Sequence, residues 1–228
     1  MNGSVAIPSL VRSSVILTAV LAVALTALAS ESPVATPERK TIIVLGDSLA
    51  AGAGLDPSEA FPALLQKKVD AEHWKFTVVN AGVSGDTTAG GLRRMDWLLK
   101  QRMDVLLLEL GGNDGLRGIP VEATRKNLQE IVDRAKKKYP QVQIVVAGMH
   151  MPPNMGEEHN ASFRRIFPEL AETNNATLIP FLLEGVGGKS ELNLPDRIHP
   201  TAEGHKIVAE NVWKILKPVL EKMNSTKQ

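Results

Sequence analysis

Five short apolar runs punctuate the chain, and the segments between them repeat apolar residues with the period of a helix. The runs are continuous rather than alternating, as in strands covered on both faces, and they span 41–45, 76–79, 104–110, 142–147 and 177–182. Strand–helix alternation at this spacing favours right-handed crossover connections. The pattern therefore predicts an α/β fold, a doubly wound three-layer α/β/α sandwich around a five-stranded parallel sheet.

The helical stripes differ in regularity along the chain. Apolar residues return at three- and four-residue intervals within 61–69, 121–139, 163–170 and 208–219. A less regular stripe covers 87–101. One folded domain is expected over 40–221, followed by a flexible tail at 222–228.

The N-terminal segment is typical of an export signal. Arg12 is the only charged residue among the first thirty, and residues 15–29 are apolar apart from two threonines. Ala27-Leu28-Ala29 provides a small-residue cleavage pattern, so we expect a signal peptide over 1–29, cut after Ala29, and a disordered linker over 30–39. Periplasmic or secreted localisation follows, with an uncleaved N-terminal membrane helix as the alternative. The chain contains no cysteine, which excludes a lipoprotein anchor and disulfides.

The charge balance argues against several classes of partner. The chain has 26 Lys and Arg against 25 Asp and Glu, and removal of the signal peptide takes away Arg12 alone. A neutral chain without a basic cluster is unsuited to nucleic acid. Lys136-Lys137-Lys138 lies at the end of a predicted helix, where cations complement the helix dipole. No stable membrane anchor after cleavage and no obligate protein partner are expected.

In a parallel sheet of this kind, functional residues gather in the loops that follow the strands. Gly46-Asp47-Ser48-Leu49 directly follows the first apolar run. A serine at such a strand-to-helix turn can present its hydroxyl at the carboxyl edge of the sheet. By itself, the same tetrapeptide is equally well explained as a polar turn.

Three further loops carry groups that acyl transfer requires. Gly82 offers a backbone N–H that no side chain shields, and Asn113 offers a side-chain amide to a developing oxyanion. Asp196 lies three residues before His199, where it can hold the imidazole so that the other ring nitrogen accepts a proton from Ser48. Each element alone is also typical of an ordinary turn. Together they supply nucleophile, base, orienting carboxylate and oxyanion donors.

These blocks, in this order, resemble those of the GDSL, or SGNH, hydrolase family. The matching segments are Gly46-Asp47-Ser48-Leu49, Gly82, Gly111-Gly112-Asn113-Asp114 and Asp196-x-x-His199, and the similarity covers about residues 41–220. The segments 80–87 and 111–118 are closest to a branch of acyl thioesterases, arylesterases and lysophospholipases. Arg197 departs from the small residue expected at its position in that branch.

The resemblance implies specific roles. Ser48 would be the nucleophile, His199 the base and Asp196 its orienting partner. The oxyanion hole would comprise the Ser48 and Gly82 backbone N–H groups and the Asn113 side chain. The resemblance also implies strand order 2-1-3-4-5.

We therefore expect a serine esterase that acts on carboxylic-ester or thioester acyl groups through an acyl-enzyme intermediate. An acyl groove is expected from seven apolar residues, for which core packing is an equal alternative: Leu49, Leu116, Ile119, Met149, Met151, Met155 and Ile198. A carbohydrate O-deacetylase of the same family and a catalytically silent binding protein are the alternative functions.

No cofactor or metal is expected. The glycines after the first apolar run do not have dinucleotide-binding spacing, and no apolar run is followed by Gly-Lys-Ser/Thr. His150 and His159 flank two glutamates, but at a spacing that suits metal coordination poorly.

Overall fold

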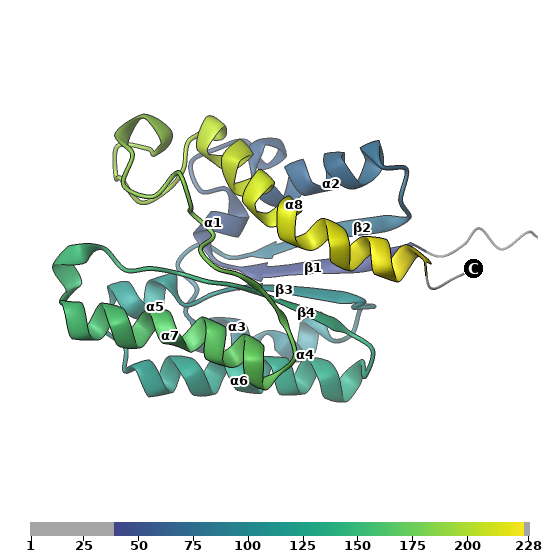
Figure 1. The fold of residues 1–228 in the computed structure, drawn as a ribbon, viewed down its shortest axis with the longest axis horizontal. Coiled ribbons are helices and arrows are strands. Elements are labelled where there is room, and N and C mark those ends of the chain that lie inside the picture. Colours follow the sequence, from purple (N-terminus) through teal and green to yellow (C-terminus); the bar gives the residue numbers. More distant parts are fainter. Residues whose placement is uncertain (1–38, 226–228) are drawn as a thin grey trace, which may run out of the picture. The chain divides into compact units, whose positions relative to one another are not determined.

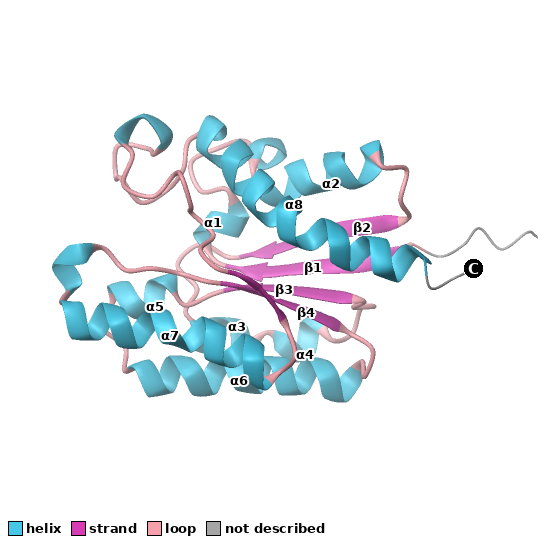
Figure 2. Cartoon of the chain, viewed as in Figure 1, coloured by secondary structure: helices cyan, strands magenta, loops and turns pink. Residues whose placement is uncertain are grey.

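A computed structural model describes residues 39–225, which form a parallel sheet between two helical layers (Figures 1 and 2). The expected signal peptide at 1–29, linker residues 30–38 and residues 226–228 lie outside the described residues. The sheet has five strands in the order β2-β1-β3-β4-β5, all parallel. The strands are β1 (Lys40–Gly46), β2 (Phe76–Gly82), β3 (Val105–Glu109), β4 (Gln143–Ala147) and β5 (Thr177–Ile179). The predicted fold class and strand order are confirmed.

The helices divide between the two faces of the sheet. Helices α2 (Phe61–Ala71) and α8 (Ala202–Ser225) pack together on one face. On the other face, α6 (Val121–Lys138) packs against both α3 (Thr88–Arg93) and α7 (Glu157–Thr173) (Figure 1). Shorter elements are α1 (Ser48–Ala51), α4 (Met95–Leu98), α5 (Gly112–Leu116) and 3₁₀ turns at Pro57–Glu59, Pro153–Met155 and Ser190–Leu192.

The segment expected as one helix over 87–101 is two helices, α3 and α4, which meet at Arg94. Gly90 and Gly91 allow α3 to lie very close to its neighbours, because a Cβ at Gly91 would stand 2.2 Å from a Leu110 methyl. The Arg94 guanidinium donates to Asp86 and to the Gly46 carbonyl. These contacts of the Arg94 side chain coincide with the break between α3 and α4, and the apolar pattern of the sequence gives no sign of a break there.

Two boundaries also differ from the expectation. Strand β5 ends at Ile179, before the predicted end at 182. Helix α8 continues to Ser225, so residues 222–225 are helical rather than part of a tail. Packing explains the extension, because Leu220 is fully buried and Met223 lies against the core. At the other end, Arg39 was expected in the linker but donates to Asp70 and Thr77.

The strands end in register, and this alignment creates the site. Residues 42–45 of β1 are fully buried, as is β3 almost throughout. Gly46 pairs with Gly82 on one side and with Glu109 on the other. The segments that follow β1, β2 and β3 therefore leave the sheet at a common edge.

A buried histidine joins the helices on the α8 face. The His205 side chain is 1% exposed, and its Nδ1 accepts the Phe61 backbone N–H at 3.2 Å. Burial, and then the nearby His199, lower the pKa of His205 from 6.5 to about 4. Between pH 6.5 and about pH 4, this histidine is protonated in the unfolded chain but not in the folded chain, so protonation favours unfolding.

We expect the free energy of unfolding to fall as the pH decreases from about 6.5 towards 4, with H205N reducing this dependence. The asparagine oxygen can replace Nδ1 as acceptor but does not titrate. Urea unfolding at a series of pH values measures the difference. H73N is the matched control, because His73 has φ 56°, which asparagine adopts readily. Equal pH dependence of H205N and the wild type would contradict the assignment.

Candidate active site

Ser48 stands at the sheet edge because the chain changes there from strand to helix. Strand β1 ends at Gly46, and Ser48 is the first residue of α1. Asp47 caps this helix by accepting the Leu49 backbone N–H at 3.0 Å. The Ser48 hydroxyl is thus fixed just beyond the carboxyl end of a central, buried strand.

His199 connects Ser48 to a carboxylate. Its Nε2 lies 2.8 Å from Ser48 Oγ, and its Nδ1 lies 2.7 Å from Asp196 Oδ2. In the tautomer that carries its proton on Nδ1, the imidazole donates to Asp196 and accepts from the serine hydroxyl. This is the arrangement of a nucleophile, a general base and an orienting carboxylate.

The loop that carries Asp196 and His199 is a closed turn. An antiparallel bridge joins Asn193 to Pro200, and the Leu194 N–H donates to the His199 carbonyl at 2.7 Å. Inside the turn, Arg197 has φ 60°, a left-handed conformation that a smaller residue adopts more easily. At its end, Thr201 Oγ1 accepts the Gly204 N–H at 3.2 Å and so caps α8. The acid and the base are therefore held together on one rigid segment.

Asp196 accepts several hydrogen bonds despite its exposure. Its Oδ1 accepts the N–H groups of Ile198 at 2.9 Å and of His199 at 3.0 Å. The His199 backbone N–H, followed by the His199 imidazole and the Ile198 N–H, lowers the pKa of Asp196 from 3.8 to about 2. Asp196 remains a carboxylate at any pH at which an esterase would be assayed.

Asn113 approaches the site from α5. Its Nδ2 donates to Asp47 Oδ2 at 3.0 Å and to the Asp86 carbonyl at 2.9 Å. Both contacts fix the amide next to the residue that precedes Ser48. Asn113 is thus brought to the site, as expected from the sequence.

The expectation for Gly82 needs correction. Its N–H donates to Asn80 Oδ1 at 2.9 Å, and a Cβ at Gly82 would lie 2.4 Å from the Ala51 nitrogen. The glycine therefore allows β2 to approach α1, and its N–H is already occupied. Three residues later, Gly85 has φ 81°, and its N–H has no partner among the hydrogen bonds of the described residues. Arg117 links Gly85 to Asn113 by donating to Gly85 O and Asn113 Oδ1.

Two buried acids beneath Ser48 extend the site beyond what we predicted from the sequence. Asp47 is 2% exposed, and burial raises its pKa from 3.8 to about 6. Glu109, at the end of β3, is fully buried, and burial together with the Asp47 charge raises its pKa well above its usual range. The available signal for Glu109 was an acidic residue flanked on both sides by leucine near the end of the apolar run 104–110.

The comparison with known proteins agrees with this geometry. Residues 44–207 match the sequence model of the GDSL-like Lipase/Acylhydrolase family. The matched region contains the end of β1, Ser48, Asn113 and the turn that carries Asp196 and His199. The chain belongs to this family.

Relatives within the GDSL family cover most of the chain. Esterase TesA of Pseudomonas aeruginosa is 41% identical over 182 residues, which is 79% of this chain and 90% of the relative. The Escherichia coli protein described as thioesterase 1/protease 1/lysophospholipase L1 is 38% identical over 181 residues, 79% of this chain and 85% of the relative. A crystal structure of TesA, 40% identical, superposes with a TM-score of 0.76 over 78% of this chain and 99% of that one. The chain is an ester-hydrolysing enzyme of the GDSL family.

The seven residues expected to form an acyl groove of this GDSL hydrolase separate into two groups. Leu49 and Met149 are 7% and 3% exposed and belong to the hydrophobic core, so their assignment to the groove is wrong. The others are half-buried or exposed: Ile119, Met151, Met155, Leu116 and Ile198. Met151 packs against Gly115, where a Cβ would stand 2.2 Å from its sulfur.

Three large apolar side chains are exposed in the loops of the site. Leu116 and Ile198 are 39% and 46% exposed, and Val83, which the sequence did not single out, is 45% exposed. Leu116 lies after β3, Ile198 lies next to His199, and Val83 lies directly after β2. Apolar surface is therefore available beside the catalytic groups of this family member.

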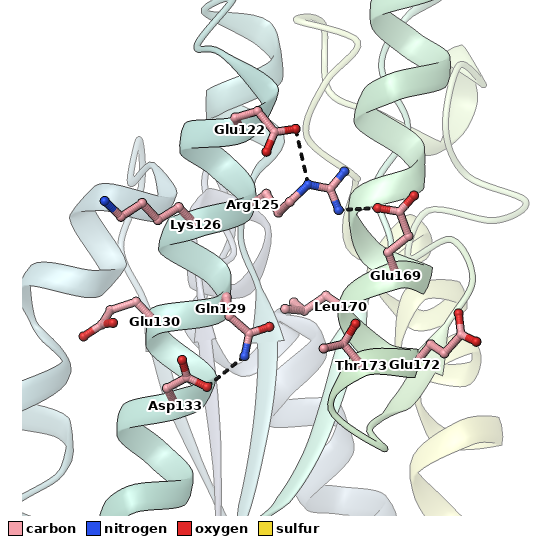
Figure 3. Close-up of a pocket in the computed structure, with 10 residues that line it drawn as sticks. All are labelled: Glu122, Arg125, Lys126, Gln129, Glu130, Asp133, Glu169, Leu170, Glu172 and Thr173. Atoms are coloured by element: carbon pink, nitrogen blue, oxygen red, sulfur yellow. Dashed lines mark hydrogen bonds and ion pairs between the residues drawn. The ribbon is translucent and has the colours of Figure 1, made fainter.

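A separate surface groove of about 610 Å³ lies between α6 and α7, in the layer opposite α8 (Figure 3). Charged and amide side chains line it and mostly pair with each other, as in the contacts of Arg125 with Glu122 and Glu169. None of the predicted catalytic residues lies there. Within residues 39–225 there is also no cluster of three metal-ligating side chains, and no helix is long and apolar enough to cross a membrane.

Proposed function

We propose that Ser48, His199 and Asp196 hydrolyse acyl esters and thioesters through an acyl-enzyme intermediate. The observation that carries this proposal is the continuous contact from Ser48 Oγ through His199 to Asp196, at 2.8 and 2.7 Å. Ser48 Oγ attacks the acyl carbonyl while His199 Nε2 accepts its proton. The protonated imidazole, held by Asp196, then donates this proton to the leaving oxygen or sulfur. A water molecule then attacks the acyl-enzyme with His199 as its base, and the acid is released as Ser48 regains its proton.

The proposed oxyanion donors are the Ser48 N–H, the Asn113 side chain and, in place of Gly82, the Gly85 N–H. Ser48 N–H lies at the start of α1, and Gly85 N–H has no partner among the described hydrogen bonds. The contacts with Asp47 and the Asp86 carbonyl place Asn113 Nδ2 beside the residue before Ser48 and use both of its N–H bonds, so Asn113 donates to the oxyanion by exchanging one of these contacts.

Asn113→Ala is expected to lower kcat by roughly 10²–10³, because one donor to the developing oxyanion is lost. KM should change much less, since the ground-state carbonyl carries less charge than the oxyanion. Steady-state kinetics on a p-nitrophenyl ester measure both constants. Asn127→Ala is the matched control, because Asn127 donates to Thr88 Oγ1 on the α6 side rather than to Asp47. An unchanged kcat in the Asn113 variant would exclude this donor.

The proposed substrates carry an apolar acyl chain. The exposed Val83, Leu116 and Ile198 beside the triad support this preference, because apolar surface at a site gains free energy when a chain covers it. We therefore expect kcat/KM to rise from acetyl esters to longer acyl esters.

The deciding experiment compares p-nitrophenyl esters of increasing chain length with acyl-CoA, lysophosphatidylcholine and acetylated sugars. Activity confined to acetylated sugars would favour the O-deacetylase instead. Failure of a fluorophosphonate probe to label Ser48 in the folded protein would favour a silent binding protein.

We also propose that the enzyme acts in the periplasm or outside the cell. The apolar segment 15–29 and the Ala27-Leu28-Ala29 pattern support export. Mass determination of the protein recovered from the periplasm of an expressing bacterium tests cleavage. An intact N-terminus in the membrane fraction would instead support the uncleaved anchor.

A further inference from the structure

Glu109 lies directly beneath the nucleophile and has no part in the mechanism above. It is fully buried at the end of β3. Its Oε2 accepts the backbone N–H groups of Asp47 and Ala50, each at 3.2 Å. These residues stand on either side of Ser48 in the turn, so a single carboxyl oxygen fixes the backbone that carries the serine.

The fold leaves space for this carboxyl group. A Cβ at Gly46 would lie 2.3 Å from Glu109 Oε2, so a glycine is needed where β1 passes the side chain. Gly46 and Glu109 are also directly paired between β1 and β3. The glycine of the Gly-Asp-Ser-Leu segment and the acid on the neighbouring strand are therefore sterically matched.

The second oxygen of Glu109 is without a hydrogen-bond partner. Oε1 is buried and unpaired among the described residues, and no ion pair described for residues 39–225 includes Glu109. A charged carboxylate in this position would be buried without compensation, which is strongly unfavourable. A proton on Oε1 would remove the charge and turn an unpaired acceptor into a donor.

The surrounding charges favour the same state. Asp47 is the neighbouring charged group whose charge, after burial, raises the pKa of Glu109. Asp47 in turn faces His199 and Asp86. The Arg94 guanidinium is close by, but it donates to Asp86 and to the Gly46 carbonyl. Two adjacent buried carboxyl groups share one negative charge more easily than they carry two.

We propose that Glu109 is a neutral carboxylic acid that positions both Ser48 and Asn113. Its carbonyl oxygen holds the two N–H groups around Ser48, and its acid proton is directed to Asp47. Asp47 stays ionised and accepts a hydrogen bond from this acid proton. Its two oxygens also accept the hydrogen bonds from Asn113 Nδ2 and from the Leu49 N–H. Glu109 is thus a positioning residue rather than a catalytic one. This inference rests on the proposed function of Ser48 and Asn113.

The proposal predicts different effects for two substitutions of Glu109. Glutamine retains a carbonyl oxygen for the two N–H groups and places an N–H₂ donor where the acid proton was. Alanine removes both. We expect E109A to lower kcat roughly 10²-fold with KM little changed, because the nucleophile and the oxyanion donor both lose their support. We expect E109Q to stay within about fivefold of the wild-type kcat.

A core variant of the same strand separates positioning from general destabilisation. Leu106 is fully buried three residues before Glu109, and L106A should lower the unfolding temperature without lowering kcat. A kcat for E109Q as low as that for E109A would overturn the proposal, as would an L106A kcat reduced as much as that of E109A. The E109Q comparison remains decisive if E109A does not fold.

Infrared difference spectroscopy tests the protonation state without relying on activity. The wild-type protein at neutral pH should show the carbonyl stretch of a protonated carboxylic acid, and E109Q should lack it. The same measurement on S48A should retain the band. Its absence in the wild type overturns the proposal for Glu109. Undiminished activity of S48A overturns the proposed function instead, so the two failures are distinguishable.

Discussion

Replacing Ser48 with alanine is expected to lower kcat on a chromogenic ester by roughly 10⁴–10⁶, leaving the fold intact. The Ser48 hydroxyl lies 2.8 Å from His199 Nε2, and alanine is well tolerated at the start of α1. Without the hydroxyl no acyl-enzyme can form. What remains is the contribution of the oxyanion donors to direct attack by water.

A fluorophosphonate probe gives a second readout of the same prediction. It should label the wild type and S58A but not S48A. Ser58 is a suitable control because it is exposed in a neighbouring loop and its hydroxyl is not engaged with the triad. Retention of wild-type activity by S48A would falsify the assignment of the nucleophile.

Asp196→Asn is expected to lower kcat by about 10⁴ at neutral pH, because it imposes the wrong tautomer on His199. Oδ1 of Asp196 accepts two backbone N–H groups, so the amide oxygen of the variant should take that place. The N–H₂ group then faces His199 Nδ1, which must accept. The ring proton moves to Nε2, and Nε2 can no longer accept the proton of Ser48.

KM and the unfolding temperature distinguish this effect from disruption of the loop. An effect on the tautomer should leave KM and the unfolding temperature nearly unchanged while kcat falls. D56N is the matched control, since Asp56 also accepts a backbone N–H in a loop and asparagine caps equally well. If D196N and D56N had similar kcat values, the orienting role of Asp196 would be excluded.

The parallel sheet and the convergence of the triad residues could be predicted because each rests on a local pattern, whereas the strand order was expected from the resemblance to the GDSL family. Continuous apolar runs mark strands covered on both sides, and their carboxyl ends must share an edge. Ser48, Asn113 and the Asp196–His199 pair each follow a strand or precede the last helix. Their convergence is therefore a consequence of topology, and it did not depend on the details of any loop.

Other features depend on side-chain contacts between distant segments. The break at Arg94 results from contacts with Asp86 and the Gly46 carbonyl, which no periodicity in 87–101 reveals. Gly82 was expected to donate to the oxyanion because it lacks a side chain, but Asn80, two residues earlier, accepts its N–H. An exposed backbone N–H is not recognisable from residue type alone, because any nearby acceptor can occupy it.

The assignments of Leu49 and Met149 failed for a related reason. Both residues follow a strand, as a lining residue would, but their side chains turn back into the core. The direction of a side chain in a loop is set by the local backbone, whereas the apolar pattern records only that a residue is hydrophobic. Leu116 and Ile198 have the same character and are exposed.

The hydrogen bond between Ser48 and His199 joins positions 151 residues apart in the sequence. One partner follows the first strand of the sheet, and the other immediately precedes the last helix. During synthesis, Ser48 therefore leaves the ribosome well before His199. Hydrolysis can begin only after α8 has docked, so the appearance of activity during refolding is a direct measure of when the two ends of the fold have closed.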